Sequence, residues 1–487
     1  MKKLIMLIAS GFLFSWQLIA QNEVDALRYS NLIFGGTARY TALAGAFGAV
    51  GADFSTLSTN PAGIGLFKSS EFAFSPSLYV GKTSAAYNGS TRDDLRYNFN
   101  LGHAGLVIAF PTNTAMNTEG WRNIQFGFGI NRSQNFNNRI LLQGNNNSSS
   151  LLDSWVGYAN GNFSDQLNGF DTQLAFDTWL LDTITGDPTH YNNAKPASGV
   201  IQRKAIQSGG SMNEWVFSLG ANYDDRLYIG ATLGFPFLKY SETSTYTEMA
   251  ISPPANITEF EEFNYHSDLA TTGSGINFKF GLIFKPVDFI RIGAAIHTPT
   301  YFYSMQDTYS NKMDSKFING DTYSATSPKG EFNYKLTTPM KMMGSIAFII
   351  GKSGLISADY EYIDYSEARL RSSNPEDFFN ANDAVRNKYT TAGNIHLGAE
   401  WKVQQFSLRG GYAVYGSPFK SGINDGKRTA LTFGFGLRQN NYFLDFAYAL
   451  TDSKEDYYLY SATESQLNPV KNDIKSQNFM MSLGFKF

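Results

Sequence analysis

Four basic side chains could pair with the carboxylate of a bound molecule. Hydrogen bonds from Arg or Lys to a carboxylate are charge-assisted and are among the strongest polar contacts in proteins. The same residues also fit as ordinary charges on a polar inner surface. They are Arg39, Arg132, Lys279 and Arg409.

The five histidines give no indication of metal or haem chemistry. Haem iron is held by axial side chains such as His or Tyr, and zinc sites use closely spaced ligands. No paired spacing of that kind occurs, and His103 and His396 lie in predicted strands, where they fit as polar fillers of an interior. We therefore predict no metal and no cofactor. The histidines are His103, His190, His266, His297 and His396.

Motifs of common enzymes are missing as well. The sequence contains no Gly-x-Ser-x-Gly, no His-Glu-x-x-His and no phosphate-binding loop. Asp177, Asp182 and Asp187 are spaced by five residues, which is not an EF-hand pattern. The absence of cysteine excludes thiolate zinc sites, iron–sulfur clusters, a cysteine nucleophile and disulfides. We predict that the protein is not an enzyme and has no catalytic residue.

The elements that carry these side chains follow from the composition. Aromatic residues make up 15% of the 487 residues and occur together with 45 Gly. This mixture favours strands and turns over helices. Charged residues are only 17% and the net charge is −3, which disfavours a nucleic-acid partner. We expect a large all-β protein.

The N-terminus has the features of a secretory signal peptide. Lys2 and Lys3 precede an apolar run, and the small residue Ala20 stands where cleavage needs one. The run is shorter than the roughly 20 residues that a spanning helix requires. We expect residues 1–20 to be removed near Ala20 and the mature protein to be exported.

Alternation with a period of two recurs along the remaining chain. Residues 124–130 alternate large apolar side chains with Gln and Gly. An apolar face and a polar face are what a transmembrane barrel needs, with lipid outside and a polar lumen inside. Comparable rows occur at 215–223, 276–284, 395–401, 431–437 and 442–448.

We predict a 14-stranded antiparallel transmembrane β-barrel over residues 67–487, in the outer membrane of a Gram-negative cell. Short turns at 224–225, 286–287, 351–354, 403–405 and 439–441 alternate with long polar connections. This is typical of barrels with one periplasmic and one external end. The long connections are expected at 83–95, 135–212, 247–268, 307–330, 369–391, 417–427 and 456–474, and the largest is 135–212.

The last predicted strand carries a lipid-facing apolar row that ends at the final residue. This pattern resembles the C-terminal signal by which the outer-membrane assembly machinery recognises its substrates. We therefore expect that machinery and membrane lipid as partners. The row is Phe479, Met481, Leu483, Phe485 and Phe487.

Residues 21–66 precede the first strand and do not alternate. Residues 22–34 have apolar spacing close to that of a helix, and residues 35–51 are dense in Gly and Ala. Such a backbone can pack closely against other surfaces. We predict that residues 21–66 form a small N-terminal helical hatch in the barrel lumen.

Within this hatch, Gly45-Ala46-Phe47, Asp53 and Asn60-Pro61-Ala62-Gly63 resemble the hatch of the long-chain fatty-acid transporter family (FadL/TodX type). Barrel segments are similar to family positions as well. The resemblance implies a monomeric barrel that takes up hydrophobic small molecules, either long-chain fatty acids or aromatic hydrocarbons, by hatch-gated diffusion and lateral release into the membrane. The barrel segments are Gly273-Ser274-Gly275, His297-Thr298-Pro299, Thr338-Pro339 and Arg409-Gly410-Gly411-Tyr412.

The candidate ligand contacts are Arg39, Tyr40 and Phe54 in the hatch, and Trp155 and Trp179 in the external loop. Apolar clusters on an external loop usually mark a binding surface, although these could also pack a small core within the loop. Two other functions stay open. The first is a non-transport partner protein on the same fold, such as a secretion-apparatus shuttle or a surface interaction protein, and the second is a non-specific porin.

Overall fold

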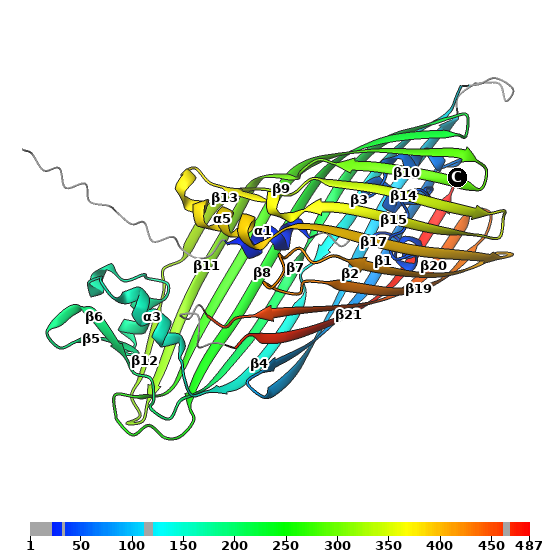
Figure 1. Ribbon diagram of the computed structural model, residues 1–487. Coiled ribbons are helices and arrows are strands. Elements are labelled where there is room, and N and C mark those ends of the chain that lie inside the picture. The colour runs from blue at the N-terminus through cyan, green and yellow to red at the C-terminus, as the bar shows by residue number, and fades with distance from the viewer. Residues whose placement is uncertain (1–21, 32–34, 112–119, 461–467) are drawn as a thin grey trace, which may run out of the picture.

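The computed structural model describes residues 22–31, 35–111, 120–460 and 468–487, so the predicted signal peptide lies outside the described residues. Fourteen antiparallel strands form one closed barrel, which confirms the predicted fold class. The first strand pairs with the last, from Glu71 opposite Lys486 to Ala86 opposite Lys471 (Figure 1).

Three of the strands continue beyond a bend as a second segment. Two of these bends contain Pro299 and Pro339, which have no backbone N–H to donate to a ladder. The strands are β1 (Glu71–Tyr87), β2 (Ser90–Pro111), β3 (Trp121–Asn135) with β4 (Asn138–Asn146), β7 (Val200–Tyr223), β8 (Leu227–Ala250), β9 (Phe260–Val287), β10 (Ile290–His297) with β11 (Tyr301–Phe317), β13 (Gly330–Thr337) with β14 (Lys341–Ile350), β15 (Gly354–Asp364), β17 (Thr391–Val403), β18 (Phe406–Tyr415), β19 (Arg428–Arg438), β20 (Tyr442–Tyr457) and β21 (Val470–Lys486).

Alternation along each strand separates an outer face from a lumen face. On β3, Phe126 and Phe128 point outward and are each 37% exposed, whereas Gln125 is buried. Outward apolar rows of this kind form the lipid-facing band of a transmembrane barrel. Farther along β7 the exposed positions Arg203 and Gln207 are polar, so this strand extends beyond the band. No helix among the described residues is long and apolar enough to cross a membrane.

At one barrel end, the predicted short turns at 224–225, 351–354, 403–405 and 439–441 agree with the structure, whereas the one predicted at 286–287 lies at 288–289, because β9 continues to Val287. At the turn between β7 and β8, Asp224 and Asp225 have φ values of +55° and +52°. Tight hairpins favour such positive φ values, which Asp tolerates better than most residues. We call this the periplasmic end, because the barrel's two terminal strands also begin and end there.

Several predicted long connections are wrong because the strands continue through them. Residues 83–95 form a hairpin, in which β1 and β2 pair up to Tyr87 opposite Ser90 around Asn88-Gly89. Residues 135–212 contain β4 and the first part of β7, and residues 247–268 and 307–330 contain the ends of β8, β9 and β11. Beyond the lipid band the outward positions carry polar side chains such as Glu261, and the inward ones, such as Phe260 and Met313, are buried against residues 151–194. The outward apolar alternation that predicts a membrane strand is therefore lost there.

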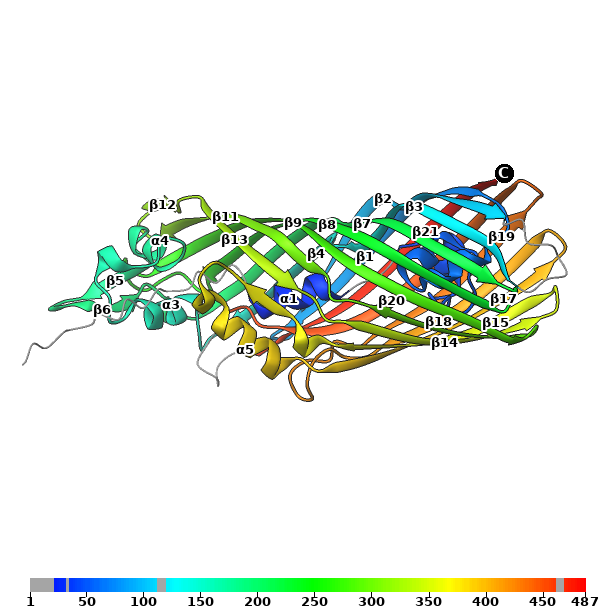
Figure 2. The ribbon, with the colours of Figure 1, turned by 90° about the horizontal axis from the view of Figure 1, so that it is seen from above.

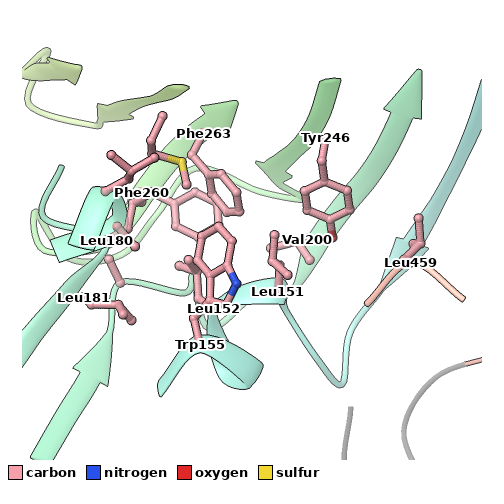
Figure 3. Packing of buried hydrophobic residues seen from close by; sticks show 14 of the residues in the cluster. Leu151, Leu152, Trp155, Leu180, Leu181, Val200, Tyr246, Phe260, Phe263 and Leu459 are labelled. Carbon is pink, nitrogen blue, oxygen red and sulfur yellow. The ribbon is translucent and has the colours of Figure 1, made fainter. Parts of the chain in front are cut away.

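The connection between β4 and β7, at the barrel end opposite the short turns, folds into a cap with its own core. Trp155 is only 4% exposed and packs edge-on against Tyr265 at 5.1 Å between ring centroids. Figure 3 shows Trp155 among leucines of the cap and aromatics of the long strands. The cap comprises α3 (Leu151–Ala159), η3 (Ser164–Gln166), α4 (Thr172–Asp177), β5 (Leu181–Ile184) and β6 (Asp187–Asn193), and it lies beside β12 (Thr322–Thr326).

A second external connection, between β15 and β17, also folds. It contains η4 (Tyr365–Glu367), β16 (Arg369–Arg371), η5 (Pro375–Phe378) and α5 (Phe379–Lys388). Val385 of α5 is fully buried in a core that it shares with the lumen side chains Leu336 and Ile363. This connection therefore covers part of the external mouth.

The N-terminal segment lies inside the barrel, as Figures 1 and 2 show in blue. Helix α1 (Glu23–Ser30) lies near α5, toward the cap. Residues 35–66, which we call the plug, comprise α2 (Ala38–Ala42), η1 (Phe54–Ser58) and η2 (Pro61–Leu66) and lie toward the periplasmic end. The Gly/Ala-rich stretch is helical only over the five residues of α2, because Gly45 and Gly51 take positive φ values.

Candidate gate and lumen site

The plug is attached to the barrel wall by a buried ion pair. Arg39 of α2 donates to Glu400 of β17 from Nε to Oε2 at 2.8 Å and from Nη2 to Oε1 at 3.1 Å. Its guanidinium also lies 5.1 Å from the ring centroid of Phe47. Glu400 in turn accepts from Arg409 at 2.6 Å, and Arg409 donates to Asp445 at 2.6 Å. Two of the predicted carboxylate partners, Arg39 and Arg409, are therefore engaged by protein carboxylates.

A second wall carboxylate binds the plug backbone. Asp359 of β15 accepts from the amide of Phe47 at 2.9 Å and from the amide of Gly48 at 2.8 Å. A carboxylate that accepts two backbone N–H groups fixes the position of that turn. Phe47 itself is fully buried, between Tyr40 and wall residues. Gly45, with φ +82°, makes the turn before it.

The remaining motif residues organise the plug internally. Asp53 caps η1 by accepting from Ser55 N and also accepts from Thr37 Oγ1, both at 2.9 Å. Asn60 caps η2 at the amide of Ala62 and donates to Gly48 O at 2.6 Å and to Leu282 O of the wall at 3.2 Å. Pro61 takes the first position of η2, where its missing N–H costs nothing.

Gly63 lies where a side chain would collide with Thr56, since a Cβ there would come within 2.6 Å of Thr56 Cβ. Its carbonyl accepts from Ala52 N at 3.0 Å, which joins the two halves of the plug. Phe54 is 2% exposed and stacks near His103 at 5.0 Å between centroids. The motif residues thus form the plug and its seat rather than an open binding surface.

Three histidines lie between wall and plug. His396 Nδ1 lies 2.7 Å from Ala44 O, and His297 Nε2 lies 2.6 Å from Thr59 O. His103 Nδ1 lies 2.8 Å from Ser75 Oγ of the neighbouring strand. His103 and His396 face the lumen as predicted, and His297 and His396 also bind the plug.

The barrel wall has a window between β2 and β3. These strands pair from Pro111 opposite Asn123 to His103 opposite Asn131, and the ladder stops there. Beyond Asn131, β3 pairs only with β7 and has a bulge at Arg132. Its continuation β4 packs against the β1–β2 hairpin, where Thr83 Oγ1 donates to Arg139 O at 2.5 Å. Beyond Asn131, therefore, no ladder of backbone hydrogen bonds joins the described residues of β2 to those of β3.

Gly35, at the start of the plug, fills the window. Its amide donates to Arg132 O at 2.9 Å, a carbonyl that the β2 ladder leaves free. A Cβ at Gly35 would lie 3.3 Å from Gly102 Cα and 3.5 Å from Arg132 Cβ, so only a backbone without a side chain fits comfortably. Arg132 Nε donates to Leu101 O at 3.2 Å and joins the two window edges.

A central cavity of about 270 Å³ opens beside the window. Gly35, Tyr40, Arg132 and Arg428 are among its lining residues. The Arg428 guanidinium lies 4.2 Å from the ring centroid of Tyr415 and donates to Asn31 Oδ1 at 3.5 Å. Its Nε is buried without a hydrogen-bond partner, and no carboxylate among the described residues forms an ion pair with it. This arginine can receive an anionic group.

Helix α1 closes the lumen on the external side of this cavity. Tyr29 is 1% exposed and packs edge-on against Phe136 and Tyr240, and Tyr389 donates to Glu23 O at 3.0 Å. Asp25 forms an ion pair with Arg28. Burial raises the pKa of the Asp25 carboxyl to about 6, although the Arg28 charge opposes the shift.

Solved structures share this architecture. No family model and no curated protein matches the chain. A Pseudomonas aeruginosa FadL homologue aligns with a TM-score of 0.55 and 13% identity over 93% of this chain and 98% of its own. The P. putida toluene transporter TodX aligns with a TM-score of 0.53 and 10% identity over 93% and 99%. The fold is that of the FadL-type barrels. The predicted resemblance is confirmed at this level.

The candidate residues predicted from the sequence lie in different environments in this FadL-type barrel. Trp155 lies in the core of the cap, whereas Trp179 is 56% exposed and has a φ of +59°. Lys279 is paired with Glu214 at 2.5 Å. Sequence reasoning missed Arg428 because it stands at the edge of a strand, where no alternation marks the lumen face. In the sequence, nothing distinguishes Gly35 from the other residues of the Gly-rich stretch.

Proposed function

We propose that this protein is an outer-membrane channel for hydrophobic small molecules, which leave the lumen sideways through the window between β2 and β3. The observation that carries the proposal is the contact of Gly35 with Arg132 O, because it places the start of the plug in a ladder break that lies beside the central cavity. The aligned P. putida protein TodX is a toluene transporter, which supports this function.

The ligand class that fits best is an amphiphile with a carboxylate, such as a long-chain fatty acid. Most residues that line the cavity carry a hydroxyl, amide or charged group, although more of the exposed lining surface is apolar than polar, and Arg428 supplies a cation without a protein carboxylate. A plain aromatic hydrocarbon would leave these polar groups unmatched. The carboxylate would bind Arg428, and the acyl chain would point toward the window.

The outer side of the window favours release into lipid. Leu95, Tyr97, Phe99 and Leu101 of β2 point outward beside it, and Phe99 is 77% exposed. An acyl chain that passes the window therefore meets an apolar surface and then the membrane. Release requires Gly35 to leave Arg132 O, which is the proposed gating movement.

A disulfide across the window tests this mechanism. The chain has no cysteine of its own, and a Cβ at Gly35 would lie 3.5 Å from Arg132 Cβ, within the range that disulfides require. The double variant Gly35→Cys/Arg132→Cys should lose uptake of radiolabelled oleate when oxidised and regain it on reduction. Each single variant serves as a control. Equal uptake in the oxidised and reduced forms would exclude this exit.

Uptake measurements on a strain that lacks the gene distinguish the channel from the alternative functions. Loss of fatty-acid uptake supports the channel. Unchanged uptake of both fatty acids and toluene would instead favour the partner-protein alternative, and capture of secreted proteins by the cap would then be the next measurement. High, salt-dependent conductance of the unmodified protein in planar bilayers would indicate a porin.

A further inference from the structure

The periplasmic end of the barrel contains another cavity, below the plug. Its volume is about 500 Å³, and it shares no lining residue with the central cavity. Residues 50–52 and 65–67 of the plug and the adjoining chain form its roof. We call it the periplasmic vestibule.

Positive charge is concentrated in the vestibule, although the whole chain has a net charge of −3. Only two carboxylates, Glu71 and Asp225, line it. Cationic side chains come from wall strands around the mouth, from the turn after β14 and from the end of the plug. They are Arg39, Lys68, Lys285, Arg291, Lys352, Lys402, Arg438 and Lys486.

Some of these cations are compensated and others are not. Lys285 pairs with Asp288 at 3.0 Å, and Lys402 lies 3.5 Å from Glu400. Arg438 and Lys486 have only distant partners, each 3.8 Å away. Within the described ranges, no ion pair is formed by Lys68, Arg291 or Lys352, so the vestibule keeps an excess of positive charge.

Arg291 of β10 has an unused donor. Its Nη1 donates to Val50 O of the plug at 2.6 Å, but its Nε is buried without a hydrogen-bond partner. Buried donors are normally paired, since an unpaired one loses its hydration without replacement. Because Nε has almost no exposed surface, an acceptor in the vestibule reaches it when the Arg291 side chain turns toward the cavity.

We infer that the periplasmic vestibule binds a small phosphate-bearing anion. Phosphate offers several acceptor oxygens and up to two charges, which suits a site where Arg and Lys side chains converge from different strands. The cavity is large enough for a phosphate ester. The group could come from a soluble phosphate compound of the periplasm or from the headgroup of an inner-leaflet phospholipid.

The anion would act on the plug through Arg291. Binding of an anion through Nε would turn the guanidinium toward the vestibule and away from Val50 O, so the anion competes with the plug for this side chain. Occupancy would weaken the attachment of residues 50–52 from the periplasmic side. This site is independent of the ligand proposed for the central cavity.

Calorimetric titration of the full-length protein in neutral detergent, with inorganic phosphate at low ionic strength, tests the inference. The vestibule variant is Arg291→Gln/Lys352→Gln. The matched control is Lys82→Gln/Lys454→Gln, which removes two cations that are 49% and 73% exposed on the outer ends of β1 and β20. We expect phosphate binding about tenfold weaker in the vestibule variant and unchanged in the control.

A second experiment distinguishes a soluble phosphate compound from a phospholipid headgroup. Native mass spectrometry after reconstitution with and without phosphatidylglycerol shows whether the lipid stays bound only when the vestibule is intact. Such retention assigns a lipid headgroup, whereas phosphate binding without lipid retention assigns a soluble anion.

The single variant Lys352→Gln distinguishes loss of the site from misfolding, because Lys352 lies in a turn away from the plug. It should also weaken phosphate binding. Equal phosphate affinity in the vestibule and control variants, or no binding at millimolar phosphate, would overturn the inference.

Discussion

Arg39 of the plug and Glu400 of the wall form a doubly hydrogen-bonded ion pair across 361 residues of sequence. Glu400 is also bonded to Arg409, and the Glu400 and Arg409 side chains are both fully buried. One carboxylate therefore holds the plug to the barrel and joins two neighbouring strands. Removing one member of a buried pair leaves an uncompensated charge, which costs about 3–5 kcal/mol.

Glu400→Gln should therefore release the plug before it unfolds the barrel. We expect a lower temperature of plug unfolding and greater susceptibility of cells to small polar antibiotics, while the heat-modifiable mobility of the folded barrel persists. Lys454→Gln, which removes one exposed charge, is the control. Unchanged antibiotic susceptibility in Glu400→Gln would show that this pair does not hold the plug.

The seat of η2 can be tested with a matched pair of glycines. A Cβ at Gly230 would lie 2.2 Å from Pro61 O, whereas a Cβ at Gly344 would meet nothing within 4 Å. Gly230→Val should displace the plug and raise small-solute permeability. Gly344→Val should leave it at the unmodified level. Similar permeability in both variants would contradict a tight seat at Pro61.

Deletion of residues 35–54 is the more drastic test of the plug. It removes Gly35, α2 and the turn that binds Asp359. We expect permeability to small polar antibiotics to rise more than in Glu400→Gln. If the barrel is still assembled and susceptibility is unchanged, residues 35–54 do not block the lumen.

Arg428→Gln should weaken binding of a fatty acid about tenfold, because a charge-assisted hydrogen bond to its carboxylate is lost. Toluene has no carboxylate, so its binding should not change. Lys420→Gln, on the adjacent external connection, makes the same change in net charge outside the cavity. Equal loss of oleate and toluene binding would indicate a packing defect rather than loss of a carboxylate contact.

Docking of α1 should depend on pH through Asp25. The pKa of its carboxyl is about 6 in the docked helix and near 3.8 when free, so the docked state binds the proton more tightly. Docking is then strongest below pH 4 and weakens as the pH rises through 6. Labelling of Ala26→Cys, which is buried when docked, should be slower at pH 5 than at pH 7.5 after correction for thiol ionisation. In the Asp25→Asn background this difference should disappear.

The predicted monomer, the cleavage near Ala20 and the role of the C-terminal row in assembly stay predictions. The row itself lies as expected, since Phe479 and Phe485 are each 46% exposed on the outer face of β21. The hatch motif was also placed correctly in the lumen. Its residues could be located because they resemble the hatch of FadL/TodX-type transporters, and in the structure Asp53 and Asn60 form local caps of the kind such residues favour.

The sequence by itself determined the barrel, because period-two alternation such as that of Phe126 and Phe128 is a local consequence of lipid on one side. It did not determine where strands end beyond the lipid, since the outward face of residues 83–95 is largely polar, as at Arg92 and Asp93, while Ala85 and Tyr87 are buried in the core of the cap. Only the tertiary structure decided that Glu400 meets Arg39, that Gly35 fills the window and that Arg428 lines the cavity. Those contacts depend on strand register and on the path of the N-terminal segment, which bring together residues hundreds of positions apart.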